Sequence, residues 1–224
     1  MSGKKYTAAK KLVDSKKVYP FAEAVNLAKE TSYAKFDASI DIAIKLNVDT
    51  TKAEQQLRGS IALPHYYGKT SRILVIDDSV TAAEAKKAGA DYFGGDEKIA
   101  EIKDGWLDFD VLITSPKFMP KLAKLGKILG PKGLMPNPKL GTVTTKVLDT
   151  VKEFKVGKST YRTDTYGNVH MIIGKKSAKT EDVVENIETL INFITSKRPA
   201  SLKGEYVKSI YISSTMGPSI RIKY

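Results

Sequence analysis

The sequence S-I-D-I-A-I-K-L-N-V at residues 39–48 decides the fold, because apolar and polar side chains alternate along it. Successive side chains of a β-strand point to opposite faces of the sheet. We therefore predict a strand over residues 36–48, with one face buried and the other in contact with water.

The same alternation returns in the C-terminal third of the chain. The segment D-T-Y-G-N at 164–168 has the composition of a hairpin turn, and T-M-G-P at 215–218 separates a second pair of strands. An amphipathic helix between them runs from Thr180, its expected N-cap, to Pro199. The other elements expected outside the middle of the chain are strands at 59–63, 161–163, 169–173, 206–214 and 219–223 and helices at 4–16 and 20–30.

In the middle of the chain, apolar runs do not alternate. I-L-V-I at 73–76 and F-D-V-L-I at 109–113 are each followed by a helical segment, and a weaker strand and helix span residues 91–103. Such strands, each followed by a helix, are typical of a parallel sheet that is covered on both faces. The helices expected after the two runs are at about 80–88 and from about Pro120.

These patterns predict an α+β two-layer domain, with an antiparallel sheet and helices, that is interrupted by an inserted three-layer α/β domain of Rossmann-like type. The discontinuous domain would comprise residues 1–67 and 157–224, and the inserted domain residues 68–156. The two connections, near residues 64–70 and 155–159, would act together as a hinge.

The composition favours a polyanionic partner. The 224 residues carry a formal net charge of +12, and each lysine placed on a phosphate releases condensed counterions, so nucleic acid is the first candidate. An anionic membrane surface is the second, but no apolar run approaches the roughly 20 residues that span a bilayer, and the N-terminus lacks an apolar signal region. Without cysteine there is no disulfide, thiolate nucleophile or Cys-ligated zinc. We expect a cytoplasmic protein.

The segment G-P-K-G-L-M-P-N-P-K-L-G-T-V at 130–143 predicts a shaped loop, because its three prolines and three glycines exclude helix and strand. No carboxylate lies between Asp110 and Asp149, so the charge here is only positive. A contact with a phosphate backbone and a surface loop whose lysines serve solubility are equal interpretations on charge alone. Lys121 and Lys124, on the helix expected before the loop, are predicted to face outward.

The inserted domain raises one alternative, a nucleotide-dependent α/β enzyme, but its motifs are poor. Gly68-Lys69-Thr70 resembles the end of a phosphate loop, yet the leading glycine is absent and the apolar strand follows it. His65 and His170 have no metal-ligand spacing around them. Asp77 and Asp78 end an apolar strand, where a helix-capping turn is a better interpretation than a ligand site. We expect no catalytic residue, metal or cofactor.

The loop ends of the discontinuous domain supply a second binding feature. Lys35 and Phe36 start the long strand, residues 164–167 turn the hairpin, and residues 215–217 interrupt the last strand pair. We expect these ends to converge. Hydroxyls, a glycine, a methionine and a phenylalanine with modest charge suit RNA recognition through 2′-hydroxyls and sugars better than readout of duplex DNA.

Several segments along the chain resemble the large-subunit ribosomal protein one family. The proline-rich loop and the Thr-Met-Gly-Pro turn are the most specific, and the others follow in the family's order. The resembling segments are K-F-D at 35–37 with Ser39, A-L-P-H at 62–65, G-W-L-D-F-D-V at 105–111, L-G-K-I-L-G-P-K-G-L-M-P-N-P-K at 125–139, Y-R at 161–162 with Asp164 and Gly167, and S-S-T-M-G-P at 213–218.

The resemblance implies a ribosome-associated, two-domain protein of the mobile stalk beside the exit site. Its partners would be large-subunit ribosomal RNA, exit-site tRNA, which it helps to release once deacylated, the mRNA of its own operon, whose translation it represses, and other large-subunit components; the free protein would be a monomer. The RNA contacts that it implies are Lys35, Phe36, Ser39, Asp164, Gly167, Ser209, Thr215, Met216 and Gly217. A secondary RNA surface would include Lys121, Lys124, Gly130, Lys132, Gly133 and Lys139.

Two positions depart from the family pattern. Tyr66 and Tyr67 follow the A-L-P-H segment, where small residues or glycine are usual, so the freedom of the hinge is expected to differ. Thr165 and Tyr166 replace a common Lys-Thr pair in the hairpin. The phosphate contact of that lysine is therefore not carried over.

Overall fold

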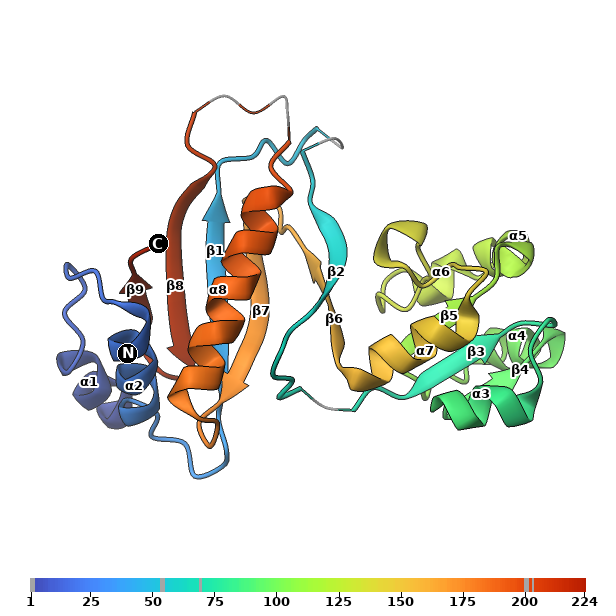
Figure 1. Ribbon diagram of the computed structural model, residues 1–224, viewed down its shortest axis with the longest axis horizontal. Coiled ribbons are helices and arrows are strands. Elements are labelled where there is room, and N and C mark those ends of the chain that lie inside the picture. Colours follow the sequence, from blue (N-terminus) through green and yellow to red (C-terminus); the bar gives the residue numbers. More distant parts are fainter. Residues whose placement is uncertain (1–2, 53–54, 69, 200–201, 203) are drawn as a thin grey trace. The chain divides into compact units, whose positions relative to one another are not determined.

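The computed structural model describes residues 3–52, 55–68, 70–199, 202 and 204–224. The chain forms two compact units, a discontinuous unit of Met1–Gly68 with Tyr161–Tyr224 and a middle unit of Lys69–Thr160 (Figure 1). Helices and strands occur in both, as the predicted mixture of α and β structure requires. The predicted domain and hinge ranges also include residues 1–2, 53–54, 69, 200–201 and 203, which lie outside the described residues.

The discontinuous unit is built on a four-stranded antiparallel sheet in the order β7-β1-β8-β9. Strand β1 (Ser39–Leu46) confirms the predicted alternation, since every second residue is buried. Ile40, Ile42 and Ile44 share one face and are at most 1% exposed. The other strands of this sheet are β7 (Asn168–Lys175), β8 (Val207–Ser214) and β9 (Ile220–Ile222).

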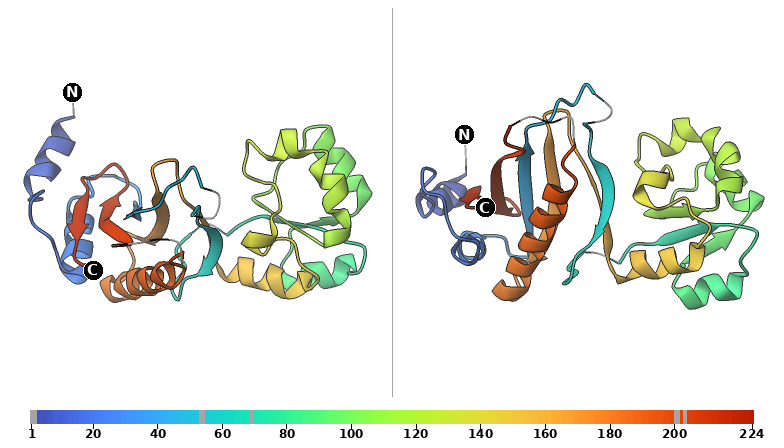
Figure 2. Two further views of the ribbon diagram at one scale, coloured as in Figure 1. Left: turned by 90° about the horizontal axis from the view of Figure 1, so that it is seen from above. Right: turned by 45° about the horizontal axis from the view of Figure 1, so that its top comes forward.

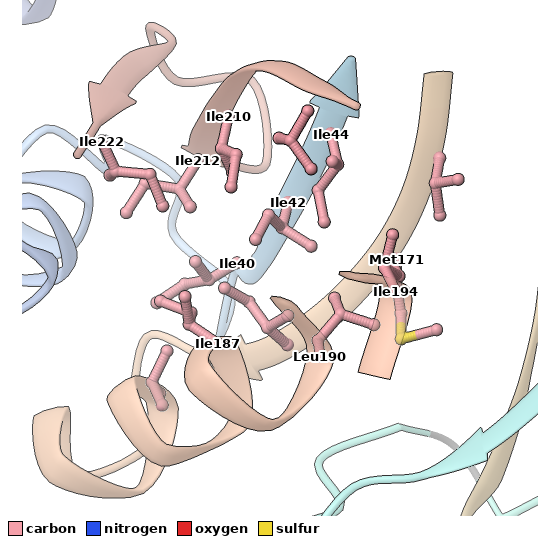
Figure 3. Packing of buried hydrophobic residues seen from close by; sticks show 14 of the residues in the cluster. Ile40, Ile42, Ile44, Met171, Ile187, Leu190, Ile194, Ile210, Ile212 and Ile222 are labelled. Carbon is pink, nitrogen blue, oxygen red and sulfur yellow. The ribbon is translucent and has the colours of Figure 1, made fainter. Parts of the chain in front are cut away.

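Helix α8 (Thr180–Ser196) covers the buried face of this sheet (Figure 2). Its Ile187, Leu190 and Ile194 pack on the isoleucines of β1 and β8 (Figure 3). Full burial of such a side chain contributes about 1.5–3 kcal/mol of transfer free energy. The remaining elements of this part of the chain are α1 (Lys4–Lys11), α2 (Phe21–Glu30) and the two-stranded pair of β2 (Arg58–Ala62) and β6 (Lys158–Arg162).

The middle unit contains a three-stranded parallel sheet in the order β4-β3-β5. All four residues of β3 (Ile73–Ile76) are buried, as its continuous apolar run predicts. One face packs on α3 and α7, and the other on α4, α5 and α6. The elements of this unit are α3 (Ala82–Ala88), β4 (Tyr92–Gly94), α4 (Asp96–Lys103), β5 (Val111–Thr114), η1 (Pro116–Phe118), α5 (Met119–Ala123), α6 (Gly126–Leu129), η2 (Pro138–Leu140) and α7 (Val147–Val156).

Three helices differ from their predictions. The first ends at Lys11 instead of residue 16. The helix expected from Pro120 is broken into α5 and α6, because Leu125 N donates to Leu122 O in a tight three-residue turn and a glycine follows. Helix α8 begins at Thr180, so its N-cap is Lys179, and the Thr180 hydroxyl donates to Asn26 Oδ1 at 2.8 Å instead.

The turn after β3 is held by Asp77, but it does not cap a helix. The Asp77 carboxylate accepts hydrogen bonds from the backbone N–H of Asp78 at 2.8 Å and from the hydroxyl of Ser79 at 2.7 Å. Helix α3 is capped later, by a capping box between Thr81 and Glu84. The predicted helix-capping role of Asp77 and Asp78 is therefore wrong, and the helix is capped by Thr81.

The segment that contains Tyr66 and Tyr67 is fixed to α8 within the discontinuous unit. The fully buried Asn186 accepts a hydrogen bond from His65 N at 3.1 Å and donates to His65 O at 2.7 Å. The Tyr67 hydroxyl donates to Asp182 Oδ2 at 2.7 Å, and burial together with this bond raises the pKa of Tyr67 to about 12. The chain is therefore anchored up to the last residues before Gly68.

Candidate nucleic-acid interface

The four-stranded sheet has a second face, which we call the open face, whose side chains are exposed or half-buried. It follows from the alternation: the residues between the buried isoleucines point the other way. The strand register aligns Ala43 of β1 with Tyr211 of β8 and His170 of β7. The open face consists of Ser39, Asp41, Ala43, Lys45, Asn168, His170, Ile172, Ser209, Tyr211, Ser213 and Arg221.

One end of the open face brings together the start of β1 and the turn after β8. Thr215 N donates to Ser39 O at 2.9 Å, and Ser39 N donates to the Thr215 hydroxyl at 3.1 Å. The side chains of Phe36 and Met216 are 55% and 66% exposed, although both are large and apolar. Such side chains are available for stacking on bases or sugars. We call this the Phe36–Met216 end; Lys35 and Gly217 also lie there.

The backbone of the Phe36–Met216 end is shaped for close approach. Met216 has φ 63°, in the left-handed region that residues other than glycine rarely adopt. Its carbonyl accepts a hydrogen bond from the Tyr33 hydroxyl at 2.8 Å. A Cβ atom at Gly217 would lie 2.3 Å from Ser214 Oγ, so a larger residue would fit this turn only if the Ser214 side chain moved. The Met216 side chain is therefore displayed on a fixed turn.

The opposite end of the open face carries the hairpin between β6 and β7, which we call the hairpin end. Asp164 accepts hydrogen bonds from the backbone N–H groups of Asn168 at 2.7 Å and Tyr166 at 2.9 Å. Partial burial opposes ionisation, but these hydrogen bonds outweigh it and hold the pKa of Asp164 at about 2. Gly167 has φ 79°, and its carbonyl accepts from Leu46 N.

The predicted convergence of all loop ends is wrong. Asp164 and Gly167 lie beside the end of β1, whereas Phe36 and Met216 lie beside its start. The cause is the register: β1 pairs antiparallel with both neighbours, so the turns that enter β7 and leave β8 lie at opposite ends of the sheet. Seven steps of about 3.3 Å separate them by roughly 23 Å. Ser209, which pairs with Lys45, belongs to the hairpin end.

The open face connects the two ends and supplies residues that the sequence analysis missed. Lys45, Tyr211 and Arg221 add cationic and aromatic groups along it. Burial raises the pKa of Asp41, and the charge of His170 opposes that rise. The signal for these residues was available, because they occupy the polar positions of the alternating strands.

The predicted secondary surface lies on the middle unit. Leu134 and Met135 pack the proline-rich loop onto its core, Leu140 is buried, and Asn137 accepts a hydrogen bond from Lys139 N at 2.8 Å. The loop is thus shaped, as predicted. Lys121 faces outward but forms an ion pair with Asp96 at 2.6 Å, which offsets its charge. The secondary-surface residues in exposed positions are Lys121, Lys124, Gly130, Lys132, Gly133 and Lys139.

In the described part of the chain, no group of three or more His, Asp or Glu side chains is arranged to hold a metal ion. The same residues contain no helix with the length and apolar character that a bilayer crossing requires. His65 Nε2 lies 2.9 Å from Glu185 Oε2, and His170 Nε2 lies 3.4 Å from Asp164 Oδ2, so each histidine makes a polar contact.

Comparison with known proteins decides the family. The Ribosomal protein L1p/L10e family matches residues 28–218. The chain belongs to this family. The large ribosomal subunit protein uL1 of Mycoplasmoides gallisepticum is 57% identical over 220 residues, 98% of this chain and 96% of the relative. The uL1 protein of Malacoplasma penetrans is 57% identical over 209 residues, which are 93% of this chain and 62% of the relative. The uL1 protein of Ureaplasma parvum is 56% identical over 219 residues, 98% of this chain and 96% of the relative.

Membership of the L1p/L10e family confirms the resemblance seen in the proline-rich loop and the Thr-Met-Gly-Pro turn. The L1p/L10e proteins are structural and not enzymes, so the prediction that this chain is no enzyme is confirmed and the alternative of a nucleotide-dependent enzyme is wrong. The matched range, residues 28–218, includes every predicted RNA contact.

Proposed function

We propose that the chain is a structural constituent of the large ribosomal subunit that binds large-subunit ribosomal RNA through the open face. The relatives named as large ribosomal subunit proteins support the first part. The open face supports the second part, because an uncovered sheet face with two exposed apolar side chains, Phe36 and Met216, at one end and cationic groups along it suits folded RNA. As a ribosomal protein of bacterial type, the chain acts in the cytoplasm.

The finer role follows from the family resemblance. The bound RNA would belong to the mobile stalk beside the exit site, where the protein assists the release of deacylated tRNA. The proline-rich loop, with exposed Lys132 and Lys139, would serve as the secondary RNA surface. The same open face would bind a similar structure in the mRNA of the protein's own operon and repress its translation.

Binding of a stalk fragment of large-subunit ribosomal RNA tests the open face. Phe36→Ala is expected to weaken binding about 5- to 150-fold at matched salt, since one base–aromatic contact supplies about 1–3 kcal/mol. Met216→Asp is expected to weaken it too, because it replaces an exposed apolar side chain with a negative charge that repels phosphate. Leu12→Asp is the matched control. Leu12 is a large apolar residue of similar exposure, 62%, but it lies at the end of α1 and outside the proposed site. Circular dichroism checks that each variant is folded. Unchanged affinity of both variants would refute the open-face site.

Repression is tested separately by binding and translation of the operon mRNA. The affinity for its leader should fall in parallel with the affinity for the stalk fragment in the Phe36 and Met216 variants. A variant that loses one RNA and keeps the other would show that the two do not share the open face. Presence of the wild-type chain in isolated large subunits tests the structural role.

A further inference from the structure

The tip of the β6–β7 hairpin displays an aromatic ring that the proposed contacts do not use. Tyr166 is 76% exposed, at the hairpin end of the open face and far from Phe36 and Met216. Tyr166 belongs to the Thr165-Tyr166 pair, which replaces the Lys-Thr pair common in the family. This chain therefore lacks the lysine expected to contact phosphate at that turn. A ring in this position offers a flat apolar surface in place of a charge.

The backbone that carries this ring is held from three sides. Asp164 Oδ1 accepts a hydrogen bond from Tyr166 N at 2.9 Å, and the Thr50 hydroxyl donates to Thr165 O at 2.7 Å. Lys45 Nζ donates to Tyr166 O. A preorganised tip loses little conformational entropy on binding, so an exposed side chain there is a more effective contact than one on a mobile loop.

A pocket of about 470 Å³ opens on the same hairpin. It contains one cation, the exposed Arg162, for which the described residues provide no salt bridge. The Asp164 carboxylate also lines it, but its oxygens accept hydrogen bonds from Asn168 and Tyr166. Its lining residues are Thr50, Gln56, Arg162, Thr163, Asp164 and Thr165.

We propose that the hairpin end binds an unpaired nucleotide of the bound RNA, with the base stacked on Tyr166 and the neighbouring phosphate held by Arg162 at the pocket. The inference rests on the proposed function and extends it to the class of nucleotide that is recognised. An unpaired base is required because a base inside a duplex has both faces covered by its neighbours. The Thr50 hydroxyl and the Gln56 amide also line the pocket, and each donates a hydrogen bond that shapes it, to Thr165 O at 2.7 Å and to Thr50 O at 2.7 Å.

The test uses two RNA probes, a stalk fragment with an internal loop of unpaired nucleotides and a fully paired duplex of equal length. Tyr166→Ala should weaken binding of the looped RNA about 5- to 150-fold, the range of one base–aromatic stack. Tyr166→Phe, which keeps the ring, should bind as the wild type does. Neither variant should change duplex binding. Arg162→Gln should reduce the slope of log affinity against log salt by about one, because one phosphate contact is lost.

Wild-type affinity of Tyr166→Ala for the looped RNA would overturn the stacking contact. An equal loss in Tyr166→Phe would also overturn it, because the hydroxyl and not the ring would then be responsible. An unchanged salt slope in Arg162→Gln would overturn the phosphate contact. Phe36→Ala separates this inference from the proposed function. Weaker RNA binding by Phe36→Ala together with normal binding by Tyr166→Ala would refute only the hairpin site. Normal RNA binding by both variants would refute the open-face site itself.

Discussion

The four-stranded and the three-stranded sheets of this protein place their strands in different surroundings. In β1, buried residues alternate with half-buried ones, whereas all residues of β3 are buried. Helix α8 covers one face of the first sheet and leaves the open face, while helices cover both faces of the second. The comparison teaches that alternation along a strand indicates a sheet face left uncovered, whereas a continuous apolar run indicates a sheet whose two faces are both covered by helices.

The largest expected effect comes from placing a charge at adjacent strand positions. Leu74→Asp and Val75→Asp should both destabilise the protein by more than about 4 kcal/mol, because both positions are fully buried. In β1, Ile42→Asp should do the same, but Ala43→Asp should cost about 1 kcal/mol or less, since it lies on the open face. Urea unfolding measures these changes. Equal destabilisation by Ile42→Asp and Ala43→Asp would contradict the claim that the two faces of the four-stranded sheet differ in burial.

A smaller change separates stability from binding on the two faces. Ile42→Ala should lower the free energy of unfolding by about 2–5 kcal/mol, because it leaves a cavity in the core. Ile172→Ala, at an open-face position that is 46% exposed, should change it by about 0.5 kcal/mol or less. We expect only the second variant to weaken stalk RNA binding at unchanged stability. Denaturant unfolding and RNA titrations on the same samples measure the stability and the RNA affinity of each variant.

The hairpin end adds a dependence on pH. Because the folded-state pKa of Asp164, about 2, is below its ordinary value of 3.8, its ionised form stabilises the folded protein above about pH 4. That contribution is lost as the pH falls from about 4 to 2. Asp164→Asn should therefore be less stable than the wild type at pH 7, with the difference vanishing near pH 2. A difference that persists undiminished at pH 2 would contradict this assignment.

The smallest effect concerns the middle unit. Lys124→Ala should reduce the salt dependence of stalk RNA binding by about one unit of slope. Lys121→Ala should reduce it less, because Lys121 is already paired with Asp96 at 2.6 Å. Affinities measured across a salt series give both slopes. An effect at Lys121 larger than at Lys124 would exclude the ion pair as the reason for their difference.

Local patterns predicted most of the elements, and the failures involve distant partners. The alternation of apolar and polar residues with a period of two predicted the uncovered face of the four-stranded sheet. The proline-rich loop could be predicted because residues such as Pro131 and Gly133 prevent a helix or strand from running through it. The order of the strands and the opposite positions of the loop ends depend on pairing between distant segments, which no local pattern specifies. The pairing of Lys121 with Asp96, 25 residues away, is equally non-local.

One local signal was available but not used. Thr81 and Glu84 have the spacing of a capping box, three residues apart, and they fix the start of α3. The break after α5 has a weaker signal, the single Gly126, because an isolated glycine is often tolerated within a helix. The exposure of Tyr166 could not be read from its hairpin, since the turn residues alone do not say what covers the ring.

The most direct test of the account is an NMR titration of the isotope-labelled protein with the stalk RNA fragment. Amide signals of Ser39, Ala43, Tyr211 and Ser213 should shift together with those of Phe36 and Met216, while those of β3 stay unchanged. Shifts confined to the proline-rich loop at residues 130–141, with the four-stranded sheet unaffected, would contradict the claim that the open face binds the RNA.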